Sequence, residues 1–234
     1  MRSFINWGIL QRIENSPKDF IVQRKVSLLS AFLFGYEHCY LQVENKKQLE
    51  IEYEGMLSLE EYARKKYHAG NIGTRNFGSI ISFNCEDERD FFYKYLDFLK
   101  EYEQKHPIKG TISFTLRETP LFELKEMLGG MRRRYPMYLG NYDISGLRAF
   151  FDGYFLCKKE YNIPLTAFEI KVGDFTDRII CETLNISGEF VTWDRLYRFG
   201  RDWCAWGEIE ERTAKEILEN FWADLEGFIG ETIE

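Results

Sequence analysis

The segment Ser27-Leu-Leu-Ser-Ala-Phe-Leu-Phe-Gly-Tyr-Glu-His-Cys39 recurs as Ser145-Gly-Leu-Arg-Ala-Phe-Phe-Asp-Gly-Tyr-Phe-Leu-Cys157 at a constant offset of 118 residues. Seven of the thirteen positions are identical: Ser27/Ser145, Leu29/Leu147, Ala31/Ala149, Phe32/Phe150, Gly35/Gly153, Tyr36/Tyr154 and Cys39/Cys157. A repeat at a fixed offset indicates that one structural unit is present twice in the chain.

The residues that follow each copy keep the same order. The segment Phe77–Ile81 occupies the place of Trp193–Tyr197, and an acidic stretch then precedes a long amphipathic segment in both copies. In that segment the large apolar residues recur with the spacing of a helix that faces a core, as Phe91, Phe92, Tyr95 and Phe98 and as Phe221, Trp222, Leu225 and Phe228. The pattern predicts a mainly α fold of two tandem, diverged helical units with a short β-containing connector.

The predicted boundaries are an N-terminal segment over residues 1–19, helical unit 1 over 20–106, a connector over 107–135 and helical unit 2 over 136–234. Pro107 marks the first boundary, because proline cannot continue the helix that precedes it. In the connector, residues 111–116 alternate like a short strand. Pro120 is expected to open a helix that stops at Gly129-Gly130 or at Tyr135-Pro136.

The first helix of each unit carries a glycine at its centre. We expect these helices over residues 26–42 and 144–161, with Ser27 and Asp143 as N-caps. Gly35 or Gly153 costs its helix about 1 kcal/mol relative to alanine. Because the glycine recurs in both copies, we expect another backbone to approach closely there. The remaining helices are expected over 58–67, 77–81 and 87–104 in unit 1, and over 175–183, 193–197 and 208–228 in unit 2.

Composition and charge narrow the class of protein. The 234 residues are 44% hydrophobic and 17% aromatic, which is enough apolar surface for a core and excludes a disordered chain. The net charge of -7 argues against a nucleic-acid binder, which needs clustered Lys and Arg. The one dense basic cluster, Arg132-Arg133-Arg134, is interpreted as a solvated helix end. An acidic surface suits a basic protein partner.

The cysteines and the hydropathy indicate a cytoplasmic protein. Five cysteines, an odd number, lie far apart without a Cys-x-x-Cys pair, which is typical of reduced thiols: Cys39, Cys85, Cys157, Cys181 and Cys204. The first residues lack a stretch apolar enough for a signal peptide, and no later segment approaches the span of a bilayer. We therefore expect a cytoplasmic protein that does not bind membranes.

Catalytic and metal-binding patterns are missing from the sequence. The three histidines, His38, His68 and His106, all lie in the first repeat, and no short His and Cys spacing or glycine-rich phosphate loop is present. The carboxylate clusters Glu86–Asp90 and Glu208–Glu211 fall at predicted helix starts, where negative charge opposes the macrodipole. We therefore expect a non-enzymatic protein without a cofactor or metal.

The segment Met131-Arg-Arg-Arg-Tyr-Pro-Met-Tyr-Leu-Gly140 resembles the Arg-Pro-x-Met-Tyr-x-Gly segment that precedes the ATP-binding helix of gyrase and related ATPases. That family has a general-base Glu and a magnesium-binding Asn in the next helix. Here the next helix reads Gly146-Leu-Arg-Ala-Phe-Phe-Asp-Gly-Tyr154 and has neither. Val172-Gly-Asp174 also departs from the family's Asp-x-Gly-x-Gly motif, so the resemblance ends after about ten residues.

Residues 131–229 also resemble small acidic immunity-like proteins of the kind encoded beside polymorphic bacterial toxins. The resemblance lies in Met137-Tyr-Leu-Gly140, in the Ser145–Tyr154 pattern, in Trp193 and in the late aromatic helix. It implies a non-enzymatic protein that neutralises a cognate toxin through a protein–protein interface. It supplies no catalytic residue.

An aromatic and acidic stretch is the predicted partner-binding surface, because Trp side chains act as buried anchors and carboxylates face a basic cleft. It comprises Trp203, Trp206, Glu208, Glu210 and Glu211. The expected partner is a basic toxin domain, and the oligomeric state stays open. The alternative function is an enzyme or small-ligand protein that uses carboxylates in a cleft between the two units.

Overall fold

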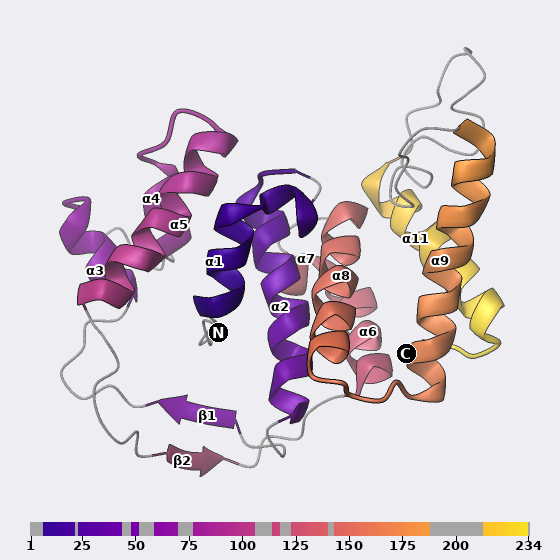
Figure 1. Ribbon diagram of the computed structural model, residues 1–234. Coiled ribbons are helices and arrows are strands. Elements are labelled where there is room, and N and C mark those ends of the chain that lie inside the picture. The colour runs from indigo at the N-terminus through magenta and orange to yellow at the C-terminus, as the bar shows by residue number, and fades with distance from the viewer. Residues whose placement is uncertain are drawn as a thin grey trace. The chain divides into compact units, whose positions relative to one another are not determined.

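The computed structural model describes residues 7–21, 23–43, 48–51, 59–69, 77–105, 114–117, 123–139, 143–187 and 213–233 (Figure 1). The protein is mainly helical, as predicted. Contacts divide the chain into two compact units, Met1–Leu29 with Glu44–Thr119, and Ser30–Val43 with Pro120–Glu234. The long helix α2, Val26–Val43, therefore begins in the first compact unit and continues in the second.

The helices of the first compact unit pack through aromatic rings. They are α1 (Trp7–Asn15), the 3₁₀ turn η1 (Pro17–Asp19), α3 (Leu59–Lys66), α4 (Phe77–Ser82) and α5 (Glu88–Lys105). Two rings pack on Phe98 of α5. The centroid of Phe77 in α4 lies 5.8 Å from the Phe98 centroid, and that of Tyr62 in α3 lies 5.4 Å from it. Of the predicted apolar stripe, Phe92 and Phe98 are fully buried, so that face of α5 does point into a core.

A two-stranded antiparallel sheet also belongs to the first compact unit. Strand β1, Gln48–Ile51, pairs with β2, Phe114–Arg117, with Gln48 opposite Arg117. The predicted connector 107–135 is not supported as a β-containing element between two units. Its strand segment pairs with β1 in the first compact unit, and its helix α6, Leu124–Arg133, lies in the second. Pairing partners distant in sequence explain the difference, because local alternation does not specify them.

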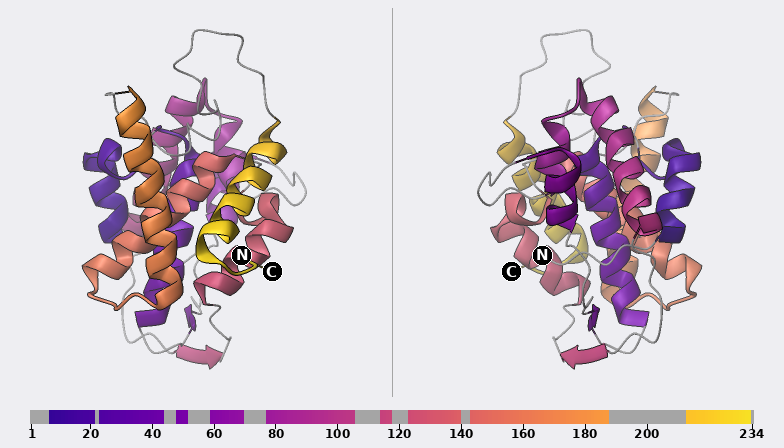
Figure 2. Two further views of the ribbon diagram at one scale, coloured as in Figure 1. Left: turned by 90° about the vertical axis from the view of Figure 1, so that its right-hand side faces the viewer. Right: turned by 90° about the vertical axis from the view of Figure 1, so that its left-hand side faces the viewer.

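The second compact unit is built around α8, Ile144–Glu160. Helices α9 (Ala167–Ser187) and α11 (Ala214–Ile229) cover the side of α8 that faces away from α2 (Figure 2), and Phe221 of α11 packs on Phe151 of α8. The short α7, Tyr135–Leu139, precedes α8. The core residue Leu225 is fully buried, whereas Phe228 at the end of the predicted stripe is 36% exposed.

Helices α2 and α8 cross at the two repeated glycines. A side-chain carbon added at Gly35 would overlap the carbonyl oxygen of Phe150, and one added at Gly153 would overlap the carbonyl oxygen of Phe32. Glycine is thus required by close backbone approach, as predicted. In the sequence repeat, Gly35 corresponds to Gly153 and Phe32 corresponds to Phe150. The contact between a glycine and a phenylalanine carbonyl oxygen is therefore made once by each helix. Phe34 contacts Phe150 and, further along both helices, Tyr40 contacts Tyr161, so α2 and α8 run in the same direction (Figure 1).

The crossing explains which positions of the repeat are identical. Ala31, Gly35 and Cys39 are each four residues apart on α2, as are Ala149, Gly153 and Cys157 on α8, and all six are buried. Rows of small residues at this spacing allow two helices to approach until their backbones touch.

The ends of several helices follow the local capping chemistry. Asp143 caps α8 as predicted, its side chain accepting a hydrogen bond from the backbone N–H of Ser145. Ser27 is not a cap, because α2 begins one residue before it. Helix α11 begins after the capping box of Thr213 and Glu216, later than predicted. Helix α6 runs through Gly129-Gly130 and ends at Arg133, so those glycines do not terminate it.

In the part of the chain that the structure describes, none of the helices combines the length and the apolar character needed to cross a membrane.

Candidate functional site

The predicted partner-binding residues Trp203, Trp206, Glu208, Glu210 and Glu211 lie outside the described residues. The other acidic cluster for which the sequence predicts a helix start is Glu86, Asp87, Glu88 and Asp90, at the turn between α4 and α5. This turn is described. We call residues 83–90 the acidic turn.

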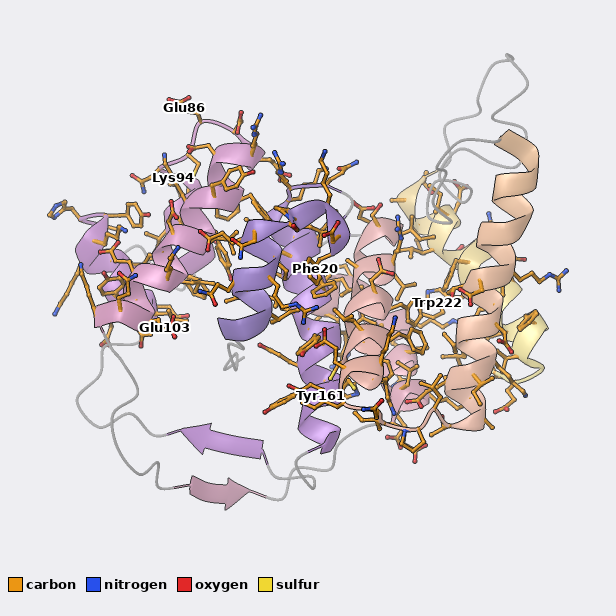
Figure 3. The ribbon with its side chains drawn as sticks, viewed as in Figure 1. Phe20, Glu86, Lys94, Glu103, Tyr161 and Trp222 are labelled. Carbon is orange, nitrogen blue, oxygen red and sulfur yellow. The ribbon has the colours of Figure 1, made fainter. Side chains whose placement is uncertain are left out.

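Phe83 is the most exposed large apolar residue in the described part of the chain, with 70% of its surface accessible. It is followed by four exposed charged side chains, Glu86, Asp87, Glu88 and Arg89. Glu86 lies in the turn before the start of α5 and points outward (Figure 3). The acidic turn therefore presents an aromatic ring next to three carboxylates.

Hydrogen bonds fix the conformation of the acidic turn. The side-chain amide of Asn84 donates to the Ile80 carbonyl oxygen at 2.9 Å, and the ammonium group of Lys94 donates to the Asn84 carbonyl oxygen at 2.7 Å. The Cys85 thiol donates to the Ile81 carbonyl oxygen at 3.1 Å. These bonds tie the turn to both flanking helices, so the exposed ring is carried on an ordered support.

The carboxylates of the turn also cap α5, as their position at a helix start predicted. Asp87 accepts from the backbone N–H of Asp90 at 2.7 Å, and Asp90 accepts from the backbone N–H of Glu86 at 3.0 Å. Lys94 donates to Asp90 at 2.8 Å. This bond and the Glu86 N–H lower the pKa of Asp90 below its ordinary value. Asp87 and Asp90 are thus engaged, whereas Glu86 and Glu88 point into solvent.

A second polar cluster is buried in the second compact unit. The carboxylate of Glu169 accepts from the Tyr154 hydroxyl, from the ammonium group of Lys158 at 2.9 Å and from the backbone N–H of Thr166 at 2.7 Å. Thr166 and Glu169 form the capping box that opens α9. Burial alone would raise the pKa of Glu169, but the bonds from Tyr154, Thr166 and Lys158 outweigh it and lower that pKa.

Further polar groups gather where α2 and α8 end. The Tyr36 hydroxyl donates to Glu160 at 2.7 Å, and Tyr40 contacts Tyr161 edge to face, near the end of α8 (Figure 3). Burial and the Glu160 carboxylate raise the pKa of the Tyr36 hydroxyl far above its usual range, so it serves as a donor only. These contacts close the end of the helix pair.

Two of the three histidines and the basic cluster lie in the described part of the chain. His38 is buried in α2 with its ring 6.1 Å from that of Tyr154, His68 follows α3, and His106 lies outside the described residues. Arg132 pairs with Glu226, while Arg133 and Arg134 are exposed at the end of α6, as predicted for a helix end. Among the described side chains, no three His, Cys, Asp or Glu residues converge in a way that could hold a metal ion.

Sequence reasoning did not single out Phe83 or the cluster of Tyr154, Lys158 and Glu169. The spacing Thr166-x-x-Glu169 before an apolar segment is the signature of a capping box and could have located the start of α9. The exposure of Phe83 had no such signal, because an aromatic residue beside a helix start is equally compatible with a core position.

Comparison with known proteins supplies no relative: no family model matches the chain, and no curated protein or solved structure shows significant similarity to it.

Proposed function

We propose that this chain is a non-enzymatic protein-binding protein that neutralises a cognate toxin by covering a basic surface on it. The observation that supports this proposal is the acidic turn, where Phe83 stands exposed on an ordered loop beside Glu86 and Glu88. A preorganised aromatic anchor flanked by carboxylates has the composition of an interface centre that fits a basic cleft. The net charge of -7 favours rapid encounter with such a partner.

The proposal includes the stretch with Trp203, Trp206, Glu208, Glu210 and Glu211. In the repeat it occupies the place of the acidic turn, so the chain would offer two related aromatic and acidic elements. The resemblance of residues 131–229 to immunity-like proteins supports the same class of function.

The first test is capture with the tagged chain from the source cell, combined with growth rescue. Cells that express the toxin-like gene next to this one are expected to survive only when this chain is co-expressed. Capture that returns no stoichiometric partner, together with no rescue, contradicts the proposal. Turnover of a small molecule by the chain would favour the alternative, an enzyme or small-ligand protein that uses carboxylates between its units.

The second test assigns the binding surface by substitution. We expect Phe83→Ala to weaken binding of the captured partner by 2 kcal/mol or more, about 30-fold, because an aromatic anchor at an interface centre contributes on that scale. The double substitution Glu86→Lys and Glu88→Lys should slow association most at low ionic strength. The matched control is Met137→Ala, since Met137 is also exposed, at 67%, but follows Arg133 and Arg134. Equal losses from Phe83→Ala and Met137→Ala would exclude the acidic turn as the binding surface.

A further inference from the structure

Two cysteines meet at the end of the crossing between α2 and α8. Cys39 lies one helical turn beyond Gly35, and Cys157 one turn beyond Gly153, on the faces that touch. Both thiols are free, both side chains have no exposed surface, and Cys39 lies close enough to Cys157 to act on its thiol. The two helices run in the same direction and touch at the glycines. Cys39 and Cys157, each one turn further along its helix, therefore face each other.

We propose that Cys39 and Cys157 are a latent disulfide, and that its formation covalently fixes the α2 segment Ser30–Val43 to the second compact unit. This segment belongs to that unit by its contacts, while the residues on both sides of it, Met1–Leu29 and Glu44–Thr119, belong to the first. In the reduced protein, packing and hydrogen bonds keep the segment in place. A bond between the two sulfur atoms would make that attachment permanent until it is reduced.

The chemistry needs a peroxide as oxidant. One thiol loses its proton, and the thiolate sulfur attacks a peroxide oxygen, so that the O–O bond breaks and a sulfenic acid and water form. The second sulfur, deprotonated in turn, attacks the sulfenic sulfur, the S–S bond forms and hydroxide leaves as water. Each sulfur loses one electron, each peroxide oxygen gains one, and both thiol protons end in the two waters.

The local environment sets the rate of this reaction. The neighbouring Cys39 side chain and burial raise the pKa of the Cys157 thiol, so that thiol stays protonated while the helix ends are closed. Thiolate formation and access of peroxide therefore require the ends of α2 and α8 to separate. The disulfide should form slowly in the native protein and faster under conditions that open this end.

The test treats the full-length protein with hydrogen peroxide and maps its disulfides by mass spectrometry without reduction. We expect a Cys39–Cys157 cross-link within one chain, which dithiothreitol reverses. It closes a loop of 118 residues and should raise the Tm on the order of 10 °C. Cys157→Ala, treated in the same way, should show no rise. Cys85→Ser, which removes a thiol that is partly exposed, should leave the cross-link and the rise unchanged.

Three results would overturn the proposal. The first is a peroxide-treated protein in which Cys39 and Cys157 stay reduced even at urea concentrations just below the unfolding midpoint. The second is oxidation of either thiol to sulfinic acid without a cross-link. The third is a cross-link that lowers the Tm, which would mean that the bond distorts the crossing and does not secure it.

Discussion

Glu101 in the first compact unit and Glu169 in the second accept hydrogen bonds from the same kinds of group but differ in their exposure to water. Each accepts from a tyrosine and a lysine that lie four residues apart on one helix. Glu101 is bound by Tyr62 and Lys66 of α3, and Glu169 is bound by Tyr154 and Lys158 of α8. The Glu101 side chain is 31% exposed, whereas that of Glu169 is 3% exposed. Similar chemistry thus stabilises a surface contact in one unit and a core contact in the other.

The same contrast extends to helix packing. The first compact unit joins α3, α4 and α5 through contacts of the Tyr62 and Phe77 rings with the Phe98 ring, and none of these contacts is between backbones. The second joins α2 and α8 through backbone contact, where no atom can be added. We therefore expect the second unit to be the less tolerant of substitution, and three predictions test this.

The largest effect is expected at the glycine crossing. Gly35→Ala should destabilise the protein by about 3 kcal/mol or more, because the new methyl group meets a carbonyl oxygen of the facing backbone that cannot move aside. Gly153→Ala should cost the same amount, since it breaks the reciprocal contact. Urea unfolding followed by circular dichroism measures both.

Gly227→Ala is the control for the glycine substitutions. Gly227 lies in α11 with no heavy atom within 4 Å of an added side-chain carbon, so alanine should stabilise the helix by up to about 1 kcal/mol. If Gly35→Ala is tolerated as well as Gly227→Ala, then the two helices are not in backbone contact in solution.

An intermediate effect is expected at the buried carboxylate. Glu169→Gln should cost about 2 to 3 kcal/mol at neutral pH, because it leaves the Lys158 ammonium group buried without its counter-charge. The folded-state pKa of Glu169 lies below its ordinary value of 4.5, so its contribution is fully present above pH 4.5 and is lost as the pH falls through the folded-state pKa. The stability of the wild type should therefore fall more steeply below pH 4.5 than that of Glu169→Gln. Parallel curves for the two proteins would show that Glu169 is protonated or unpaired in the folded state.

The contrast between these regions shows which features could be predicted from the sequence. The recurrence of Gly35 and Gly153 within apolar helices was enough to predict a close backbone approach, because only a packing constraint explains a glycine at the centre of both helices. The periodic spacing of large residues likewise placed the buried Phe92 and Phe98. Both signals are local in sequence and follow from helix geometry.

Features that depend on distant partners could not be predicted in this way. The segment Ser30–Val43 joins the second compact unit because it packs on α8, more than a hundred residues later, and no local pattern encodes that choice. The same applies to β2, whose partner β1 lies far upstream. For the candidate site, the sequence placed the carboxylates of the acidic turn at a helix start, but the exposure of Phe83 depends on what α4 and α5 leave uncovered.

The smallest effect is expected at Glu101, the exposed equivalent of Glu169. Hydrogen bonds from Lys105, Lys66 and Tyr62 lower the pKa of Glu101 to about 2, so its contribution is present above its ordinary pKa and is lost as the pH falls toward 2. Because water reaches this carboxylate, Glu101→Gln should cost only about 1 kcal/mol at pH 7, and added salt should reduce that cost. The matched control is Glu103→Gln on the same helix, which should change the unfolding free energy by less than about 0.5 kcal/mol. A loss at Glu101 as large as that at Glu169, and insensitive to salt, would mean that exposure to water does not distinguish the two carboxylates and that the first compact unit depends on its ion pairs as much as the second does.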